Sequence, residues 1–441
     1  MTLHIGLAEV DCTPALGLPL MGNYRDDYAA RGVHDPLCAR ALAFRDDDGS
    51  AAAMVAVDVC MLDRGAVAAI RDVASRCCGL AAENILVSAT HTHSSLAVTT
   101  IMGLPQAPAE AIQAFTAGVA EAIAGAWQNL APAELAIGYA AESRVSFNRR
   151  LRCRDGRTHM NWERLEESSV VEPLGPIDDR LAALWVQRNG HPAAALVNFA
   201  LHPAIMAGDN WLYSADYPGY LNEALRRSVA PDLVTLFCNG CCGDVNHVDY
   251  RDPLQGRGYK MAERVGYMLA ATAAATRRNA ATVPSHPVRV SHELVSLSRW
   301  RITEEQHRWS REVLARAGGQ AAPGQIDGLP DELYAQVWLE MYERQEQTDQ
   351  AEVMVIRLGD VGIVGLPGEV FCELGLALRQ ASPVPHTLVV ELANDAIGYL
   401  PARRAFAVGG YETTPGSTLY EPDAAERLVD SALRQLRTLF A

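Results

Sequence analysis

The sequence lacks any long uninterrupted hydrophobic stretch. No run of about 18 apolar residues, the length that suggests a membrane-spanning helix, occurs in the 441-residue chain. The amino-terminal segment, MTLHIGLAEVDCTP, also lacks the basic and apolar regions of a secretory signal peptide. We therefore expect a cytoplasmic protein without stable membrane insertion.

The sequence is also poor in positive charge. It carries 38 Lys and Arg against 53 Asp and Glu, which gives a formal net charge of -15. Nucleic acids and anionic membrane surfaces attract basic patches, so neither is an expected partner. A basic substrate is permitted by this composition but not implied by it. Nothing in the sequence sets the oligomeric state, and a homo-oligomer is compatible with it.

The ten cysteines do not have the spacing of a disulfide framework. They include the adjacent pairs Cys77-Cys78 and Cys241-Cys242, which are more typical of reduced thiols. The segment CNGCC at 238–242 contains a Cys-x-x-Cys spacing, but a structural zinc site normally needs a second pair of ligands. Reduced thiols again favour a cytoplasmic protein.

Apolar runs typical of strands alternate with helical patterns along much of the chain, which predicts an α/β fold with mixed, largely buried sheets flanked by helices. We expect one domain over residues 1–441, or two closely merged lobes. Strands are predicted at 54–59, 85–90, 181–187, 193–200, 233–238, 352–358, 361–366 and 387–392. Helices are predicted at 64–77, 109–127, 217–229, 256–277, 303–316, 331–346, 369–381 and 422–439.

Two segments have no clear period. Residues 317–330 are rich in Gly and Pro and join two charged helices, as a mobile lid or a plain surface excursion does. Residues 151–178 carry mixed charge. Residues 99–108, 151–170 and 317–330 are candidates for the wall of a substrate pocket.

The stretch THTHSS at 90–95 follows a predicted buried strand. In an extended chain, side chains two positions apart point to the same face, so His91 and His93 should project together from the carboxyl end of that strand. Two interpretations are open from these residues alone. They form a metal and proton-transfer site, or they hydrogen-bond the following loop.

Four further stretches place polar residues after a predicted strand, where ligands bind in open α/β sheets. These are LVNFALHPAIMAG with His202, LFCNGCCGDVNH with Asn246, VGIVGLPGEVF with Glu369, and NDAIGYLPARR with Tyr399. Other candidates are Arg149 in SFNRRL, Asp216 in YSADYPGY and Tyr411 in GGYETTP. Each stretch also has a structural interpretation; for example, Glu369 would be stabilised by the dipole of a helix that begins there.

Taken in this order, the motifs resemble the neutral ceramidases and their shorter relatives, which are zinc-dependent amide hydrolases. The series starts with a G…D-x-T-P…M-G segment from Gly6 to Gly22. It continues through His-Thr-His-Ser, Asn-Arg, Gly-Pro-x-Asp at 175–178, His-Pro, Ser-x-Asp, Gly-Asp-x-Asn, Pro-Gly-Glu and Gly-Tyr. The resemblance covers nearly the whole chain and implies a neutral-ceramidase-like catalytic domain.

The resemblance implies a zinc ion held by four residues, His91, His202, Glu369 and Tyr399. Imidazole and carboxylate are ordinary zinc ligands, whereas the Tyr399 phenol has to lose its proton beside the cation or bind weakly. The sequence itself does not distinguish His91 from His93 as the ligand. The resemblance selects His91.

The remaining candidates take catalytic roles in the same pattern. His93 is implied as a general acid or base, or as an orienting hydrogen-bond partner, and Asp216 is an alternative proton shuttle. Arg149 and Tyr411 are implied to bind the carbonyl or to stabilise the oxyanion. The expected reaction is hydrolysis by a water that the metal activates.

Asn246 departs from the family pattern, which has a catalytic serine at this position. An amide cannot act as a serine-like nucleophile, although it can still donate a hydrogen bond. The chain also ends at Ala441, without room for the carboxy-terminal immunoglobulin-like domain of the larger enzymes, so ceramide is not the expected substrate. We expect a zinc-dependent hydrolase of an amide (N-acyl) bond in a small or medium molecule. The alternatives are a zinc-dependent esterase or lactonase, and a catalytically silent metabolite-binding relative.

Overall fold

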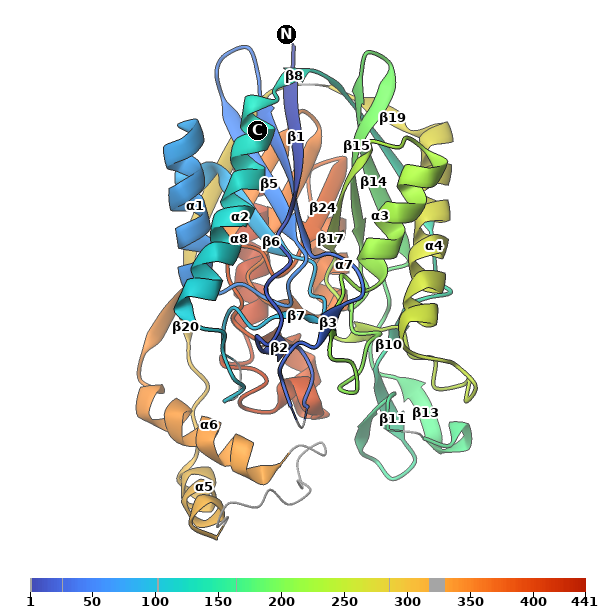
Figure 1. The fold of residues 1–441 in the computed structure, drawn as a ribbon. Helices are drawn as coiled ribbons and strands as arrows, with labels where there is room; N and C mark the ends of the chain where they lie inside the picture. Colours follow the sequence, from blue (N-terminus) through green and yellow to red (C-terminus); the bar gives the residue numbers. More distant parts are fainter. Residues whose placement is uncertain (1, 26, 101–102, 164, 285, 317–329) are drawn as a thin grey trace.

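Three large β-sheets dominate the fold, and each carries helices on its outer face (Figure 1). The computed structural model describes residues 2–441 except 26, 101–102, 164, 285 and 317–329. The predicted segment 317–330 therefore lies almost wholly outside the described residues. No helix in the described part of the chain is long and apolar enough to cross a membrane. The mixed α/β fold expected from the sequence is confirmed.

The first sheet has the strand order β6-β5-β4-β1-β8, with β5 and β6 parallel and the other pairs antiparallel. Its strands are β1 (His4–Asp11), β4 (Cys38–Arg45), β5 (Ala51–Val57), β6 (Ile85–Ala89) and β8 (Ala131–Pro132). Helices α1 (Arg64–Cys78) and α2 (Ala109–Gln128) pack on its outer face.

The second sheet has the order β17-β15-β14-β9-β19, in which β15 and β17 are parallel. Its strands are β9 (Glu134–Ala141), β14 (Arg180–Arg188), β15 (His191–Phe199), β17 (Val234–Asn239) and β19 (Ala281–Val283). Helices α3 (Tyr217–Ser228) and α4 (Tyr259–Thr276) cover its outer face.

The third sheet has the order β20-β21-β22-β24, in which β22 and β24 are parallel. Its strands are β20 (Val288–Ser298), β21 (Thr348–Leu358), β22 (Val361–Gly365) and β24 (His386–Val390). Helices α7 (Cys372–Ala381) and α8 (Ala424–Leu439) pack on its outer face. Helices α5 (Glu304–Arg316) and α6 (Asp331–Arg344) lie between β20 and β21 in the chain and project from the body of the molecule (Figure 1).

The inner faces of the three sheets share one hydrophobic core. Strand β5 shows how the sequence builds it, because its side chains alternate between two environments. Met54 and Ala56 point into the shared core, whereas Val55 and Val57 pack against the layer that holds α1 and α2. A strand buried on both faces is apolar at every position, which is why these strands appear in the sequence as continuous apolar runs.

Small sheets form at one end of the molecule, away from the chain termini (Figure 1). Loops that follow the large-sheet strands supply many of their strands. They are β2 (Leu20–Met21) with β7 (Ser95–Leu96), β3 (Gly32–Val33) with β16 (Leu212–Tyr213), β10 (Phe147–Asn148) with β18 (Val245–Asn246), β23 (Glu369–Val370) with β25 (Tyr399–Leu400), and β11 (Arg150–Cys153) with β12 (Thr158–Met160) and β13 (Val170–Pro173). The predicted site residues lie in or beside these loops.

One predicted boundary is wrong in a way that affects the site. The helix expected from residue 369 begins at Cys372, and Glu369 instead starts β23. Strand β23 pairs in parallel with β25, and the amide of Glu369 donates to the carbonyl of Gly398 at 3.0 Å. This pairing between distant segments overrides the local preference for a helix start.

Candidate metal centre

Three loops bring two imidazoles and a carboxylate together at the end of the sheets. His91 follows β6, His202 follows β15, and Glu369 lies in β23 just after β22. The Nε2 atoms of the two histidines are 2.8 Å apart, and Glu369 Oε2 lies 3.4 Å from His91 Nε2 and 3.6 Å from His202 Nε2. All three side chains are buried. Each large sheet thus contributes one of three clustered metal-binding groups.

His91 and His93 converge through a turn, and the extended geometry expected for THTHSS is wrong. His91 has a φ of 71°, in the left-handed region that His tolerates better than most residues. The turn is fixed because the amide of His91 donates to Val59 and the amide of His93 donates to Pro203. The Nε2 atoms of the two histidines still lie 3.2 Å apart.

Backbone carbonyls fix the tautomers of both candidate ligands. His91 Nδ1 lies 2.7 Å from the carbonyl oxygen of Cys60, and His202 Nδ1 lies 3.3 Å from that of Cys242. A carbonyl oxygen only accepts hydrogen bonds, so Nδ1 carries the proton and Nε2 presents a lone pair in each neutral ring. Burial lowers the pKa of His91, but Cys60 and Glu369 raise it well above its ordinary value. Without a metal ion, the Nε2 proton of His91 therefore faces the lone pair of His202 Nε2, and a bound cation would replace that proton.

Glu369 supplies a negative charge, and one of its carboxylate oxygens accepts no hydrogen bond from the described residues. Its Oε2 atom is buried and has no hydrogen-bond partner among the described residues. Burial alone would raise the pKa of Glu369, but His91, Tyr399 and Arg149 together lower it below the ordinary value. A buried carboxylate with an orphan oxygen is the group that a metal ion completes.

The spacing of these atoms fits a tetrahedral zinc ion. Ligands placed about 2.0–2.1 Å from such an ion lie about 3.3–3.4 Å from one another. The separations of 3.4 Å and 3.6 Å to Glu369 are close to this value. The two imidazoles, at 2.8 Å, would have to separate by about 0.5 Å.

Tyr399 stands beside Glu369 because their residues are partners in the β23–β25 pairing. Its phenol lowers the pKa of Glu369 and raises that of Arg149. Burial raises the pKa of Tyr399 well above its ordinary value, while Arg149 opposes that shift. The phenol is therefore protonated unless a cation is bound, as expected for the unusual member of the ligand set.

His93 lies beside this cluster and presents a neutral ring. Its carbonyl accepts a hydrogen bond from Arg25 Nη2 at 2.9 Å, and Gly22 approaches its side chain closely. Burial lowers the pKa of His93, and the charges of His91, Arg25 and Arg149 lower it further. His91, and not His93, belongs to the group that includes both His202 and Glu369, which favours His91 as the ligand.

Arg149 faces the cluster and is held by a residue that sequence reasoning missed. Its Nε atom donates to Glu412 Oε1 at 2.7 Å, and Arg150 Nη1 donates to the other oxygen of Glu412 at 2.7 Å. The Nη2 atom of Arg149 is buried without a hydrogen-bond partner in the described part of the chain. The guanidinium lies 5.2 Å from the Tyr399 ring and 5.4 Å from the Trp162 ring.

Tyr411, the residue before Glu412, completes an aromatic wall beside Arg149. Its ring centre is 5.4 Å from that of Tyr399 and 6.3 Å from that of Trp162, edge to face in both cases. Trp162 is 43% exposed, so this wall reaches from a candidate ligand towards solvent. The GGYETTP segment and the family resemblance pointed to Tyr411, whereas nothing in the sequence marked Trp162.

Asn246 uses its amide to bind another asparagine. Asn161 Nδ2 donates to Asn246 Oδ1 at 2.7 Å, and Asn246 Nδ2 donates to Asn161 Oδ1 at 2.9 Å. The backbone N–H of Asn161 also donates to the backbone carbonyl of Arg149 at 2.8 Å. Asn246 therefore helps to hold the loop that carries Trp162.

Asp216 lies apart from the contacts of the cluster and caps helix α3. Its Oδ2 accepts from the amides of Ile205 and Met206, and its Oδ1 accepts from the amide of Tyr217. Burial raises its pKa to about 6, although these three amides oppose the shift. Its contacts place it as a support for the loop after His202, and the proton-transfer role stays a prediction.

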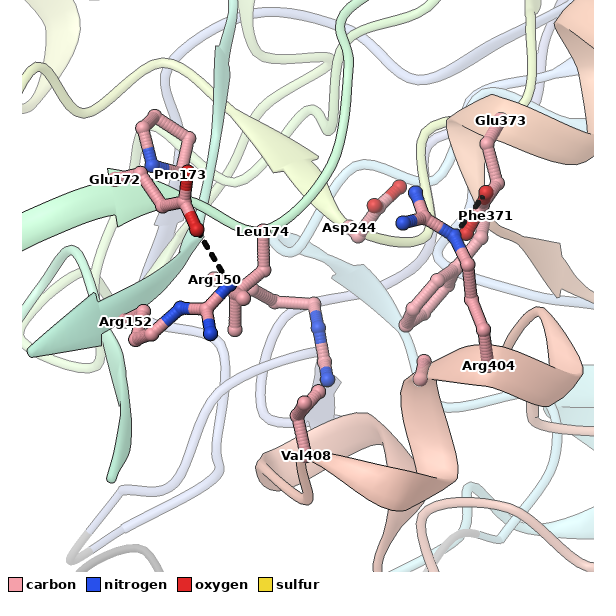
Figure 2. A pocket seen from close by; sticks show the side chains of 11 residues that line it. Arg150, Arg152, Glu172, Pro173, Leu174, Asp244, Phe371, Glu373, Arg404 and Val408 are labelled. Carbon is pink, nitrogen blue, oxygen red and sulfur yellow. Dashed lines mark hydrogen bonds and ion pairs between the residues drawn. The ribbon is translucent and has the colours of Figure 1, made fainter. Parts of the chain in front are cut away.

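A cavity of about 250 Å³ lies beside this region and is distinct from the cluster. Figure 2 shows Arg150 at its centre, between the Arg152–Glu172 and Arg404–Glu373 pairs. Adjacent residues on an extended chain point to opposite sides, so Arg149 faces the cluster while Arg150 lines the cavity. None of the four predicted zinc ligands lines it.

Comparisons with known proteins agree with this architecture. The family model described as neutral/alkaline non-lysosomal ceramidase, N-terminal, matches residues 3–247, more than half of the chain. The neutral ceramidase of Mycobacterium tuberculosis is 23% identical, and the match covers 95% of this chain and 74% of that protein. Neutral ceramidase B of Dictyostelium discoideum is 26% identical over 51% of this chain but only 32% of its own length.

Solved structures show the same fold at low sequence identity. Neutral ceramidase from Pseudomonas aeruginosa aligns with a TM-score of 0.74 at 20% identity, over 99% of this chain and 75% of that one. A ceramidase complexed with C2 aligns with a TM-score of 0.76, also at 20% identity, over 100% of this chain and 75% of that one. With the family match, these results show that the chain belongs to the neutral/alkaline non-lysosomal ceramidase family.

Proposed function

We propose that this chain is a zinc-dependent hydrolase that cleaves an amide (N-acyl) bond of a small or medium molecule. Membership of the ceramidase family supports an amide-bond hydrolase. The observation that carries the metal dependence is the convergence of two imidazole Nε2 atoms on a buried carboxylate oxygen that has no other partner among the described residues. His91, His202 and Glu369 would hold the zinc, with Tyr399 as the fourth ligand.

The chain's own groups have separate roles in this proposal. Bound zinc supplies Lewis-acid activation of a carbonyl and of a water molecule. The neutral ring of His93 accepts the proton that the attacking water loses and passes it to the leaving amine. Arg149, whose Nη2 lacks a partner in the described chain, donates to the carbonyl oxygen as negative charge develops on it. Glu412 keeps the Arg149 guanidinium in place.

The choice of a metal-activated water as nucleophile rests on Asn246 at the family serine position. Its carboxamide pairs with Asn161, so both its polar atoms are engaged. A serine-type nucleophile is absent there, and hydrolysis has to begin at the metal. We also propose a cytoplasmic location, which the ten free cysteines of the described chain support.

A substrate screen tests this function. The zinc-loaded protein is incubated with N-acyl amines, N-acyl amino acids and matched esters, and products are followed by mass spectrometry. We expect turnover of at least one amide class and its loss in Glu369→Ala. Turnover of esters without any amide would instead identify an esterase or lactonase. Binding of one of these compounds by the zinc-free protein, without turnover, would identify a catalytically silent binding protein.

A further inference from the structure

Glu391 is a buried carboxylic acid to which the mechanism above gives no role. It directly follows strand β24 and is 0% exposed. No Lys or Arg forms an ion pair with it among the described residues, unlike the buried Glu412 with its two arginines. A buried carboxyl group without a cationic partner is costly, so its contacts indicate what it does.

Both oxygens of Glu391 contact residues next to the candidate ligands. Oε2 accepts from the amide of Val370 at 2.9 Å and from the amide of Cys242 at 3.0 Å. Oε1 accepts from the thiol of Cys242 at 2.8 Å. One side chain therefore ties together the loop after β17 and strand β23.

These contacts lead to two candidate zinc ligands. Val370 follows Glu369 directly, so its amide fixes the backbone that aims the Glu369 carboxylate. Cys242 presents its carbonyl oxygen to His202 Nδ1, which orients the imidazole. Partners of this kind fix ring orientation and commonly change metal affinity 10- to 100-fold when they are removed.

The backbone of Glu391 extends the connection to the third ligand. Its amide donates to the carbonyl of Asn239 at 3.1 Å. The side chain of Asn239 donates to the carbonyl of Thr90 at 2.8 Å, and Thr90 precedes His91. The loops of all three clustered ligands are thus linked to Glu391 through short chains of hydrogen bonds.

We propose that Glu391 is a positioning residue that sets the separation and orientation of His202 and Glu369 in the metal centre. The inference rests on the proposed zinc site. It acts through the amides of Val370 and Cys242, so an uncharged acceptor of the same shape should replace it. Glutamine keeps one oxygen for the two amides, whereas methionine fills a similar volume without an oxygen.

The test measures zinc affinity of the full-length apo protein by competition with a chromophoric chelator, together with the visible spectrum of the Co²⁺ form. Glu391→Met should weaken zinc binding by about 10- to 100-fold and alter the Co²⁺ spectrum. Glu391→Gln should stay within about three-fold of wild type and keep the spectrum, as an equivalent acceptor predicts. Glu142→Ala is the matched control, because Glu142 is a buried acid whose partners are Arg144 and Thr272.

Three outcomes overturn the inference without overturning the proposed function. Wild-type affinity in Glu391→Met removes the positioning role but leaves the zinc site intact. An equal loss of affinity in Glu142→Ala shows that general destabilisation explains the effect. If Glu391→Met does not fold, a changed Co²⁺ spectrum in Glu391→Gln overturns it. A wild-type protein that binds no zinc refutes the proposed function itself, and the inference with it.

Discussion

Single residues decide how this chain differs from the pattern of its family, and Asn246 is the clearest case. Its side chain forms two reciprocal hydrogen bonds with Asn161 in a buried environment. The same Asn161 side chain also donates to the carbonyl of Val248. The pair is therefore a structural clasp under the loop that carries Trp162.

The clasp predicts coupled effects on stability. Asn246→Ala and Asn161→Ala should each lower the free energy of unfolding by about 1–3 kcal/mol, because each leaves a buried amide without its partner. The double variant should lose clearly less than the sum of the two. Urea unfolding of the four proteins measures the coupling. Strictly additive losses would contradict the clasp.

Asp216 predicts a pH dependence of stability. Its folded-state pKa of about 6 lies above the ordinary value of 3.8 because the carboxyl group is buried. The folded state therefore holds this proton more tightly than the unfolded state. The stability from this group is fully present below about pH 4 and is lost as the pH rises through about 6.

The variant Asp216→Asn tests the direction of this pH dependence. The free energy of unfolding of wild type, relative to the variant, should fall by on the order of 2–3 kcal/mol between pH 4 and 7. Denaturant unfolding across this range measures it. A difference that stays constant, or that grows with pH, would show that the Asp216 carboxyl is not held in its neutral form.

The sequence could identify the candidate ligands but not their supports. His91, His202, Glu369 and Tyr399 were found because short motifs follow predicted strands in the order of a known family. Their partners lie in no such motif. The roles of Glu412, Asn161 and Glu391 depend on burial and on contacts between residues far apart in the chain, which local patterns do not encode.

At the scale of elements, a close approach of two loops places Glu369. A Cβ atom on Gly243 would lie 2.4 Å from the carbonyl oxygen of Glu369, and the amide of Gly243 donates to Val370. The backbone that this glycine admits is strand β23.

Gly243→Ala should therefore push β23 away and weaken zinc binding by at least about ten-fold. Gly256→Ala is the control, since a Cβ atom there meets nothing within 4 Å. Competition with a chelator measures both affinities. Equal affinities in the two variants would mean that β23 tolerates the displacement.

The elements themselves were predicted unevenly. Helices such as α1 and α6 have a clear hydrophobic periodicity, and strands such as β22 are continuous apolar runs. These elements lie close to their predicted ranges. Strands β1, β4, β9 and β20 were missed, because polar residues or small alanines weaken their apolar pattern. The parallel pairing of β23 with β25 joins residues about 30 apart in sequence and has no local signal.

At the scale of the whole molecule, the candidate metal centre lies at the ends of the three large sheets. The loops after β6, β15 and β22 each supply one of the clustered groups. A metal ion bound there links the three sheets in the folded state only, so it stabilises the fold by mass action.

Chelation should accordingly lower the melting temperature of the zinc-loaded protein, and added zinc should restore it. Differential scanning calorimetry measures the shift. Glu369→Ala should melt at the same temperature with and without chelator. A chelator effect of wild-type size in that variant would place the stabilising metal elsewhere.

The zinc content of purified protein after dialysis against trace zinc tests the central claim most directly. Wild type should retain about one zinc ion per chain, as a site with His and carboxylate ligands does. His386→Ala should retain the same amount, because His386 bonds to Tyr139 outside the cluster. His202→Ala should retain almost none. Full zinc occupancy in His202→Ala, or none in wild type, would contradict the proposed metal centre.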